Sequence, residues 1–233
     1  MLKYRLAPLL FTIIFFIMLT FLGLWQLSRF NEKRQFIDTV RHNIENPAEK
    51  ISDLQQVSAF TKLQLRGQFL SDKDFYLYGR RSGAKEKDGY YLLTPFKSFD
   101  NQFVLVARGW FPRSIKDSLQ NIINSQDESI VAISLPSEKK QFFVPDNDLK
   151  NSTLFTLNVE QIAKYLNLPL PNYYLFQVES TNPVKLLKPL STSGLVNIRN
   201  DHLEYALTWF SLAGCLIIIY IIYLKKQNHL TNN

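Results

Sequence analysis

Two long apolar segments bracket a polar stretch in this chain. The first covers Leu6–Leu27 without a charged residue, and the second covers Leu203–Leu224 with Glu204 as its only charge. As a helix, each segment would extend roughly 33 Å, which is enough to cross a bilayer core of about 30 Å. We therefore predict transmembrane helices at 6–27 and 203–224, with a water-soluble domain at 28–202 between them.

The first segment fits an uncleaved anchor better than a secretory signal peptide. Lys3 and Arg5 supply the charged start of a signal peptide, but the apolar stretch is too long and no small-residue cleavage site ends it. Trp25 near its end suits a membrane interface. Two spans place the tails 1–5 and 225–233 on the same side. The flanking charges do not decide which side, because long loops translocate largely regardless of charge.

The stretch between the two spans carries mainly strand patterns. Its first part, 28–46, continues the first span as an amphipathic helix that ends before Pro47. Short runs follow that alternate in polarity or are rich in aromatic and β-branched residues. The predicted strands are Thr61–Leu70, Asp74–Tyr78, Tyr90–Lys97, Gln102–Arg108, Ser129–Leu135, Gln141–Val144 and Asn172–Glu179.

One helix interrupts the predicted strands. Asn158 and Gln161 have the spacing of a capping box before an apolar run, and Pro169 and Pro171 end that run. Because the strands are near neighbours in sequence, we predict an α+β domain. Its core is a mostly antiparallel β-sheet or open barrel with this helix packed on it. Residues 180–199 form a linker back to the membrane.

The cysteines and histidines exclude most metal and catalytic sites. Cys215 is the only cysteine, so the chain has no internal disulfide and no thiol pair for copper or zinc. The number and placement of His42, His202 and His229 exclude a three-histidine zinc site. The sequence contains no nucleophile motif and no glycine-rich phosphate loop. We therefore expect that the chain is not an enzyme.

The net charge of +7 is spread along the chain. Its densest basic stretch, 80–88, is typical of a solvated loop, with contact to an anionic group as the alternative. Binding of nucleic acid would need denser positive charge interleaved with exposed aromatic residues, so we expect no nucleic-acid partner.

His202 opens the second span, where an imidazole is costly unless it has a role. It can ligate a metal, and in a membrane the iron of a porphyrin is the leading candidate. One helical face carries His202, Tyr205, Ala206 and Trp209. Ala206 would leave room for a flat ring, and the two aromatic residues would offer stacking faces. The alternative is an interfacial aromatic belt, with Asn200 or Asp201 as the helix N-cap.

A matching cluster ends the first span. Trp25, Gln26 and Arg29 occupy one side of the predicted helix. If both spans leave the membrane at the same face, Arg29 lies at the depth of His202, where it would pair with a haem propionate or with Glu204. The alternative is an interfacial arginine that extends into water. We predict that Trp25 and Arg29 contribute to the same cofactor site as His202.

Several short motifs follow one another from the end of the first span to the start of the second. They are Gly23-Leu24-Trp25-Gln26-Leu27-Ser28-Arg29, Gly67 with Phe69, Tyr78-Gly79-Arg80, Gly89-Tyr90 with Thr94-Pro95, Val104-Leu105-Val106-Ala107-Arg108-Gly109-Trp110-Phe111-Pro112, and Asn200-Asp201-His202-Leu203-Glu204-Tyr205-Ala206-Leu207-Thr208-Trp209. Together they resemble the signatures of the SURF1 family. Members of this family are cytochrome c oxidase assembly factors of bacterial inner membranes and mitochondria. Ala107 replaces the family's asparagine, and Asp201 replaces a basic residue.

The resemblance implies a function and a topology. It implies that the chain binds haem a through His202 as an axial ligand and assists haem insertion into subunit I of cytochrome c oxidase. One histidine leaves the second axial position of the iron open, which suits transfer. The resemblance also implies cytoplasmic termini and a periplasmic domain. The lack of an Arg- and Ser-rich leader favours a bacterial inner membrane over mitochondria.

The expected partners follow from this resemblance. They are oxidase subunit I, haem A synthase and the lipid bilayer, and self-association into a homo-oligomer stays open. The alternative function is a non-haem scaffold, anchored in the membrane, that holds subunit I or haem A synthase during assembly.

Overall fold

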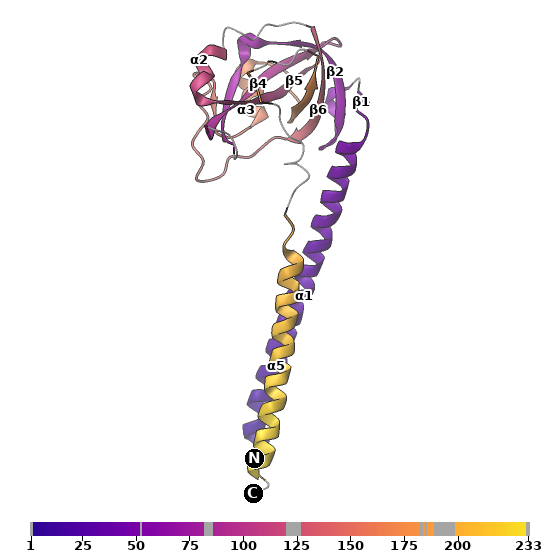
Figure 1. Ribbon diagram of the computed structural model, residues 1–233, viewed down its shortest axis with the longest axis vertical. Helices are drawn as coiled ribbons and strands as arrows, with labels where there is room; N and C mark the ends of the chain where they lie inside the picture. The colour runs from indigo at the N-terminus through magenta and orange to yellow at the C-terminus, as the bar shows by residue number, and fades with distance from the viewer. Residues whose placement is uncertain are drawn as a thin grey trace. The chain divides into compact units, whose positions relative to one another are not determined.

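The computed structural model describes residues 2–51, 53–81, 86–119, 127–181, 184, 186–188 and 199–231. The chain divides into two units. One unit comprises residues 1–39 and 197–233, and the other comprises residues 40–196. Figure 1 shows a pair of long helices, α1 (Leu2–Glu45) and α5 (His202–Thr231), and a β domain.

The helices α1 and α5 are long and apolar enough to cross a membrane. Few of their side chains are buried, and large apolar residues such as Ile17, Phe21 and Ile219 are more than 60% exposed. An apolar surface of this extent needs a non-aqueous environment or a partner. The structure confirms that the helix over 28–46 continues the first apolar segment, because α1 runs unbroken to Glu45 and ends just before Pro47.

The β domain is built on an eight-stranded mixed sheet. Its strands are β1 (Glu49–Lys50), β2 (Lys62–Phe69), β3 (Phe75–Arg80), β4 (Asp88–Ser98), β5 (Phe103–Pro112), β6 (Asp127–Pro136), β7 (Thr153–Leu154) and β8 (Tyr173–Ser180). They follow the order β1-β2-β6-β8-β5-β4-β3-β7. Most neighbours are antiparallel, as predicted, whereas β1–β2, β3–β7 and β5–β8 are parallel.

The sheet closes into a barrel, where the sequence predicted a sheet or an open barrel. The long strand β4 pairs with β3 along its first half and with β2 at its end, so β2, β6, β8, β5 and β4 form a ring. Gly67 makes this closure possible. A Cβ atom at this position would lie 2.0 Å from the carbonyl oxygen of Lys97 and 2.8 Å from the Cα of Ser98. Only glycine allows so close an approach of the two backbones.

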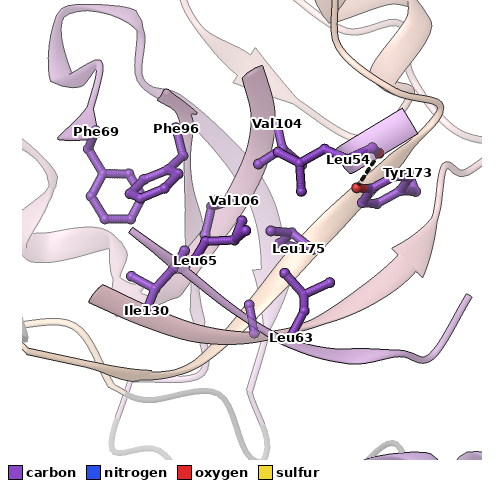
Figure 2. Close-up of a cluster of buried hydrophobic side chains, with 11 residues drawn as sticks. Leu54, Leu63, Leu65, Phe69, Phe96, Val104, Val106, Ile130, Tyr173 and Leu175 are labelled. Atoms are coloured by element: carbon purple, nitrogen blue, oxygen red, sulfur yellow. Dashed lines mark hydrogen bonds between the residues drawn. The ribbon is translucent and has the colours of Figure 1, made fainter. Parts of the chain in front are cut away.

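The barrel interior is filled by alternating side chains from its strands. Leu63, Leu65 and Phe69 of β2 point inward, as their spacing predicted, and the ring of Phe69 packs edge-on against that of Phe96. Figure 2 shows this cluster, together with the hydrogen bond that the Tyr173 hydroxyl donates to the Leu54 carbonyl oxygen over 2.7 Å.

Two short helices lie among the described residues of the β domain between β5 and β8. They are α2 (Lys116–Leu119) and α3 (Val159–Leu166), and the 3-10 turns are η1 (Leu54–Gln56), η2 (Ser71–Lys73) and η3 (Arg113–Ile115). The predicted N-cap of α3 is confirmed, because Asn158 accepts a hydrogen bond from the Gln161 N–H over 3.0 Å. The Gln161 side chain instead accepts from Asn147. The helix ends at Asn167, which is left-handed with φ 51°, before Pro169 is reached.

One strand prediction for the domain needs correction, and two other predicted segments are only partly described. The strand expected at Gln141–Val144 is a turn. The linker expected at 180–199 lies largely outside the described residues, but Lys188 forms a bridge with Trp110 in which each N–H donates to the other's carbonyl oxygen. The basic stretch 80–88 is also only partly described, since 82–85 lie outside the described residues.

The last turns of α1 belong to the β domain. Val40 and Ile44 are buried in one cluster with Ile133 and Leu135 near the end of β6. The amphipathic part of this helix therefore buries its apolar positions against the barrel, which explains the pattern seen in the sequence.

A buried ion pair joins β5 to β6. Arg108 is the extra residue of a β-bulge, because Leu92 pairs with Gly109 and Leu93 pairs with Ala107. Bulges redirect a side chain, and here the guanidinium is buried 3.6 Å from a Glu128 carboxylate oxygen. It also lies 3.8 Å from the centroid of the Phe69 ring.

Asp74 lies near this ion pair and accepts a hydrogen bond from the Thr94 hydroxyl. Burial raises the pKa of Asp74 from 3.8 to about 6, although Thr94 and Arg108 both favour the ionised carboxylate.

We predict that Gly67→Ala destabilises the barrel. The added methyl group would press on the β4 backbone, and overpacking of this kind costs about 1–3 kcal/mol. Denaturant unfolding followed by the fluorescence of buried Trp110 measures the change. Arg66→Ala, at an exposed position of the same strand, is the control and should leave the midpoint unchanged.

We also predict a pH dependence that Asp74→Asn removes. Because the folded pKa of about 6 exceeds the unfolded value of 3.8, the folded state binds the proton more tightly. The contribution of Asp74 therefore falls as pH rises from about 4 to 6, by at most about 3 kcal/mol. The unfolding free energy of the wild-type protein, measured relative to that of Asp74→Asn, should therefore fall as pH rises over this range. A difference between the two proteins that stays constant across these pH values would contradict the assignment.

Candidate functional site

His202 is the first residue of α5, and the residues before it set its position. The carbonyl oxygen of Asp201 accepts a hydrogen bond from the Tyr205 N–H over 3.3 Å, which makes Asp201 the N-cap position. The Asp201 carboxylate pairs with Arg199 Nε at 2.6 Å. The imidazole is therefore held at the start of a helix, half-buried and next to polar backbone.

A hydrogen bond to α1 sets the chemical form of this imidazole. His202 Nδ1 lies 2.7 Å from Gln26 Oε1. An amide oxygen can only accept, so Nδ1 carries the proton in the neutral ring and Nε2 keeps the lone pair. Proteins usually orient a metal-ligating histidine through a second residue, which accepts a hydrogen bond from the ring nitrogen that does not bind the metal. The pair thus presents Nε2 as a ready ligand.

Further contacts hold α1 and α5 together near this hydrogen bond. The Asn200 side-chain amide donates to the Phe30 carbonyl oxygen over 3.1 Å. Gly23 lies against the Phe210 ring, whose nearest atom would be 2.5 Å from an added Cβ. Small residues at a helix contact allow the backbones to approach closely, which is common between membrane helices. Figure 1 shows the two helices side by side.

The predicted stripe on α5 is divided between two environments. Ala206 is only 1% exposed, so its methyl group does not face open space. It shares a face with His202 and Phe210, which contact α1. Tyr205 is 57% exposed and Trp209 is half-buried. A planar ligand would therefore have to lie beside the outer part of the stripe.

The predicted residues on α1 lie on its outer surface. Trp25 is 48% exposed. Arg29 pairs with Glu32 at 2.7 Å, and both side chains are more than half exposed. The expected pair with Glu204 is not formed. An exposed ion pair contributes only about 0–1 kcal/mol, so Arg29 can exchange Glu32 for another anion at little cost.

The donor set fits a porphyrin-bound iron better than a bare metal ion. In the part of the chain that the structure describes, no group of three or more His, Cys, Asp or Glu side chains could hold a metal. A haem iron needs only one or two axial ligands from the protein, and His202 Nε2 would supply one. His42 is exposed on α1, and the side chain of His229 lies outside the described residues.

Gln26 is the residue that sequence reasoning did not assign to the site. Its place beside Trp25 in a sequence motif was the available signal. The contact partner could not be read from the sequence, because the two residues are 176 positions apart.

The chain matches a known protein family and several of its members. The model of the SURF1 family matches residues 13–214 of the chain. The chain belongs to the SURF1 family. A SURF1-like protein of Rickettsia conorii is 44% identical over 212 residues, which cover 91% of this chain and 88% of the relative. One from Rickettsia felis is 43% identical over 93% of this chain and 96% of the relative. A SURF1-like protein of Caenorhabditis elegans is 25% identical over 88% of this chain and 70% of the relative.

Several of the motifs that carried the SURF1 resemblance fall at close contacts of the fold. Gly23 and Asn200 lie where α1 and α5 meet, and Gly67 lies where the barrel closes. Arg108 forms the buried ion pair, and the indole of Trp110 donates to the Gly79 carbonyl oxygen over 3.0 Å. These motifs therefore have structural reasons of their own, separate from any ligand.

We predict that Gly23→Ile separates the two helices near His202. The test uses a protein with Cys215→Ser, Gln26→Cys and His202→Cys, in which a short bifunctional thiol reagent should link the two new thiols, because the native side chains meet across this contact. The isoleucine would meet the Phe210 ring and lower the yield of this cross-link in lipid nanodiscs. Gly214→Ile is the matched control, since nothing lies within 4 Å of an added Cβ there. An equal yield in both variants would contradict the contact.

Proposed function

We propose that this SURF1-family chain is a membrane-anchored assembly factor for cytochrome c oxidase. In this proposal it holds haem a through His202 and hands it to subunit I, possessing no catalytic activity of its own. The carrying observation is the hydrogen bond from His202 Nδ1 to Gln26, which leaves Nε2 as a basic nitrogen at the start of an apolar helix. A polar pair in this position is costly unless it has a function.

The surroundings of His202 suit binding that must later be reversed. Tyr205 and Trp25 expose large parts of their rings beside the site, where they can pack against an apolar face. Arg29 can release Glu32 and bind a carboxylate of the ligand. One histidine ligand holds the iron without enclosing it, which leaves the group open to transfer.

The location of the chain is part of the proposal. Both candidate spans expose most of their apolar surface, which supports insertion into a bilayer. The Rickettsia relatives are bacterial proteins. We propose a bacterial inner membrane, with the β domain in the periplasm and the termini in the cytoplasm. Subunit I and haem A synthase would then be reached from the same membrane.

A non-haem scaffold is the second candidate, and one observation favours it. Ala206 is packed at the helix contact, so the structure offers no preformed space for a flat ring on that side of His202. In this alternative, the polar pair of His202 and Gln26 only holds the spans together. The barrel would then carry the contacts to subunit I or haem A synthase.

Purification from a host that makes haem A tests the proposal. The full chain should carry a haem spectrum, and His202→Ala should lower the haem-to-protein ratio by at least about tenfold, because loss even of a supporting residue costs about that much. His42→Ala, at an exposed position on α1, is the control and should keep the full load.

A normal haem load in His202→Ala would remove His202 as the ligand. If the wild-type chain carries no haem and the variant still retains subunit I in a pull-down, the scaffold is the better account.

A further inference from the structure

The loop after β6 presents an aromatic pair to solvent. Phe142 and Phe143 are each 93% exposed, and their ring centroids lie 5.1 Å apart at an angle of 90°. The backbone turns at this point, where the Val144 N–H donates to the Gln141 carbonyl oxygen over 3.2 Å. Neither ring is covered by any other described part of the chain. Two adjacent phenylalanines exposed to this degree are unusual on a protein surface.

The base of this loop is fixed by polar contacts. Lys140 and Asp146 form an ion pair across it at 2.5 Å. The Asn147 side-chain oxygen accepts hydrogen bonds from the backbone N–H groups of Phe155 and Thr156, over 2.8 and 3.0 Å. On the other side, the Glu138 N–H donates to the Leu157 carbonyl oxygen over 2.8 Å. The ion pair and hydrogen bonds at its base therefore fix the conformation of the loop, and both rings stay exposed at its tip.

Holding the rings in water has a thermodynamic cost. Burial of apolar surface lowers the free energy by about 25 cal/mol for each Å² removed from water, and a phenylalanine ring is among the largest apolar side-chain surfaces. A fixed loop with two rings at its tip is thus suited to a non-aqueous environment outside this chain.

The loop leaves the barrel close to the last turns of α1. It begins two residues after Leu135, which is buried in one cluster with Val40 and Ile44 of α1. The loop therefore starts at the part of the barrel on which the helix that continues the first apolar segment packs.

Charge on the loop gives no preference for a charged partner. Lys140 is neutralised by Asp146, and the whole stretch 138–146 carries two acids, Glu138 and Asp146, and two bases, Lys139 and Lys140. Phenylalanine is among the side chains that interfacial segments bury at the boundary of headgroups and acyl chains, and a neighbouring lysine can extend its amine back into water.

We propose that Phe142 and Phe143 insert into the bilayer interface and seat the β domain on the membrane. This inference rests on the proposed membrane anchoring. With both ends of the domain tied to spans, insertion is an intramolecular step, so even a weak contact becomes populated at the high effective concentration of lipid.

Fluorescence quenching on the full chain in lipid nanodiscs tests this. In a Cys215→Ser background, Phe143→Cys is labelled with an environment-sensitive dye. We expect emission shifted to the blue, strong quenching by lipids with a nitroxide near the headgroup, and weak quenching by aqueous iodide. Phe99→Cys is the matched control, because Phe99 is also exposed, at 60%, on the turn between β4 and β5. Its label should be quenched by iodide and several times less by the lipid nitroxide.

The inference is overturned if the labels at 143 and 99 behave alike. It is also overturned if the label at 143 leaves water only when oxidase subunit I is added, which would assign the rings to a protein partner. A dye on native Cys215, which lies exposed in the middle of α5, separates this from the anchoring itself. Quenching of that dye by a nitroxide deep in the acyl chains, with position 143 in water, overturns only the loop insertion. If the dye on Cys215 is not quenched in this way, both the anchoring and the loop insertion are overturned.

Discussion

The hydrogen bond between His202 Nδ1 and Gln26 Oε1 is the interaction on which the proposed site depends. It joins the start of α5 to α1, and it determines which ring nitrogen keeps its lone pair. Either side chain alone would be a polar group at an apolar helix surface without its partner, which costs free energy in a membrane. One bond therefore aligns the spans and prepares a ligand.

The β domain rests on a different constraint, namely the close approach of backbones in a small barrel. Gly67 allows β4 to cross β2, and the bulge at Arg108 turns a charge into the interior, where Glu128 and the Phe69 ring receive it. Breaking a buried pair of this kind typically costs about 3–5 kcal/mol, because the remaining charge is left unpaired. The fold thus tolerates little change at these motif residues for reasons of stability alone.

Much of this structure could be predicted from periodicity, and the failures have physical causes. The alternation of Leu63, Leu65 and Phe69 and the cap at Asn158 act locally, so the sequence reveals them. Gln141–Val144 has strand-like residues, but polar contacts at its base hold it as a turn. The two-residue strands β1 and β7 are too short to show a period.

The site itself was only partly predictable. Helical spacing placed His202 and Ala206 on one face, but it could not tell whether that face meets a ligand or α1. Barrel closure and the choice of Gln26 as partner of His202 both depend on contacts between distant parts of the chain, which no local pattern encodes.

Nitrogen-15 NMR of the ring of His202, in the full chain in lipid nanodiscs without haem, tests the central claim most directly. The account predicts a neutral ring with the proton on Nδ1 and an unprotonated Nε2, and Gln26→Leu should abolish this preference. A ring protonated on Nε2, or a tautomer that Gln26→Leu leaves unchanged, would contradict it.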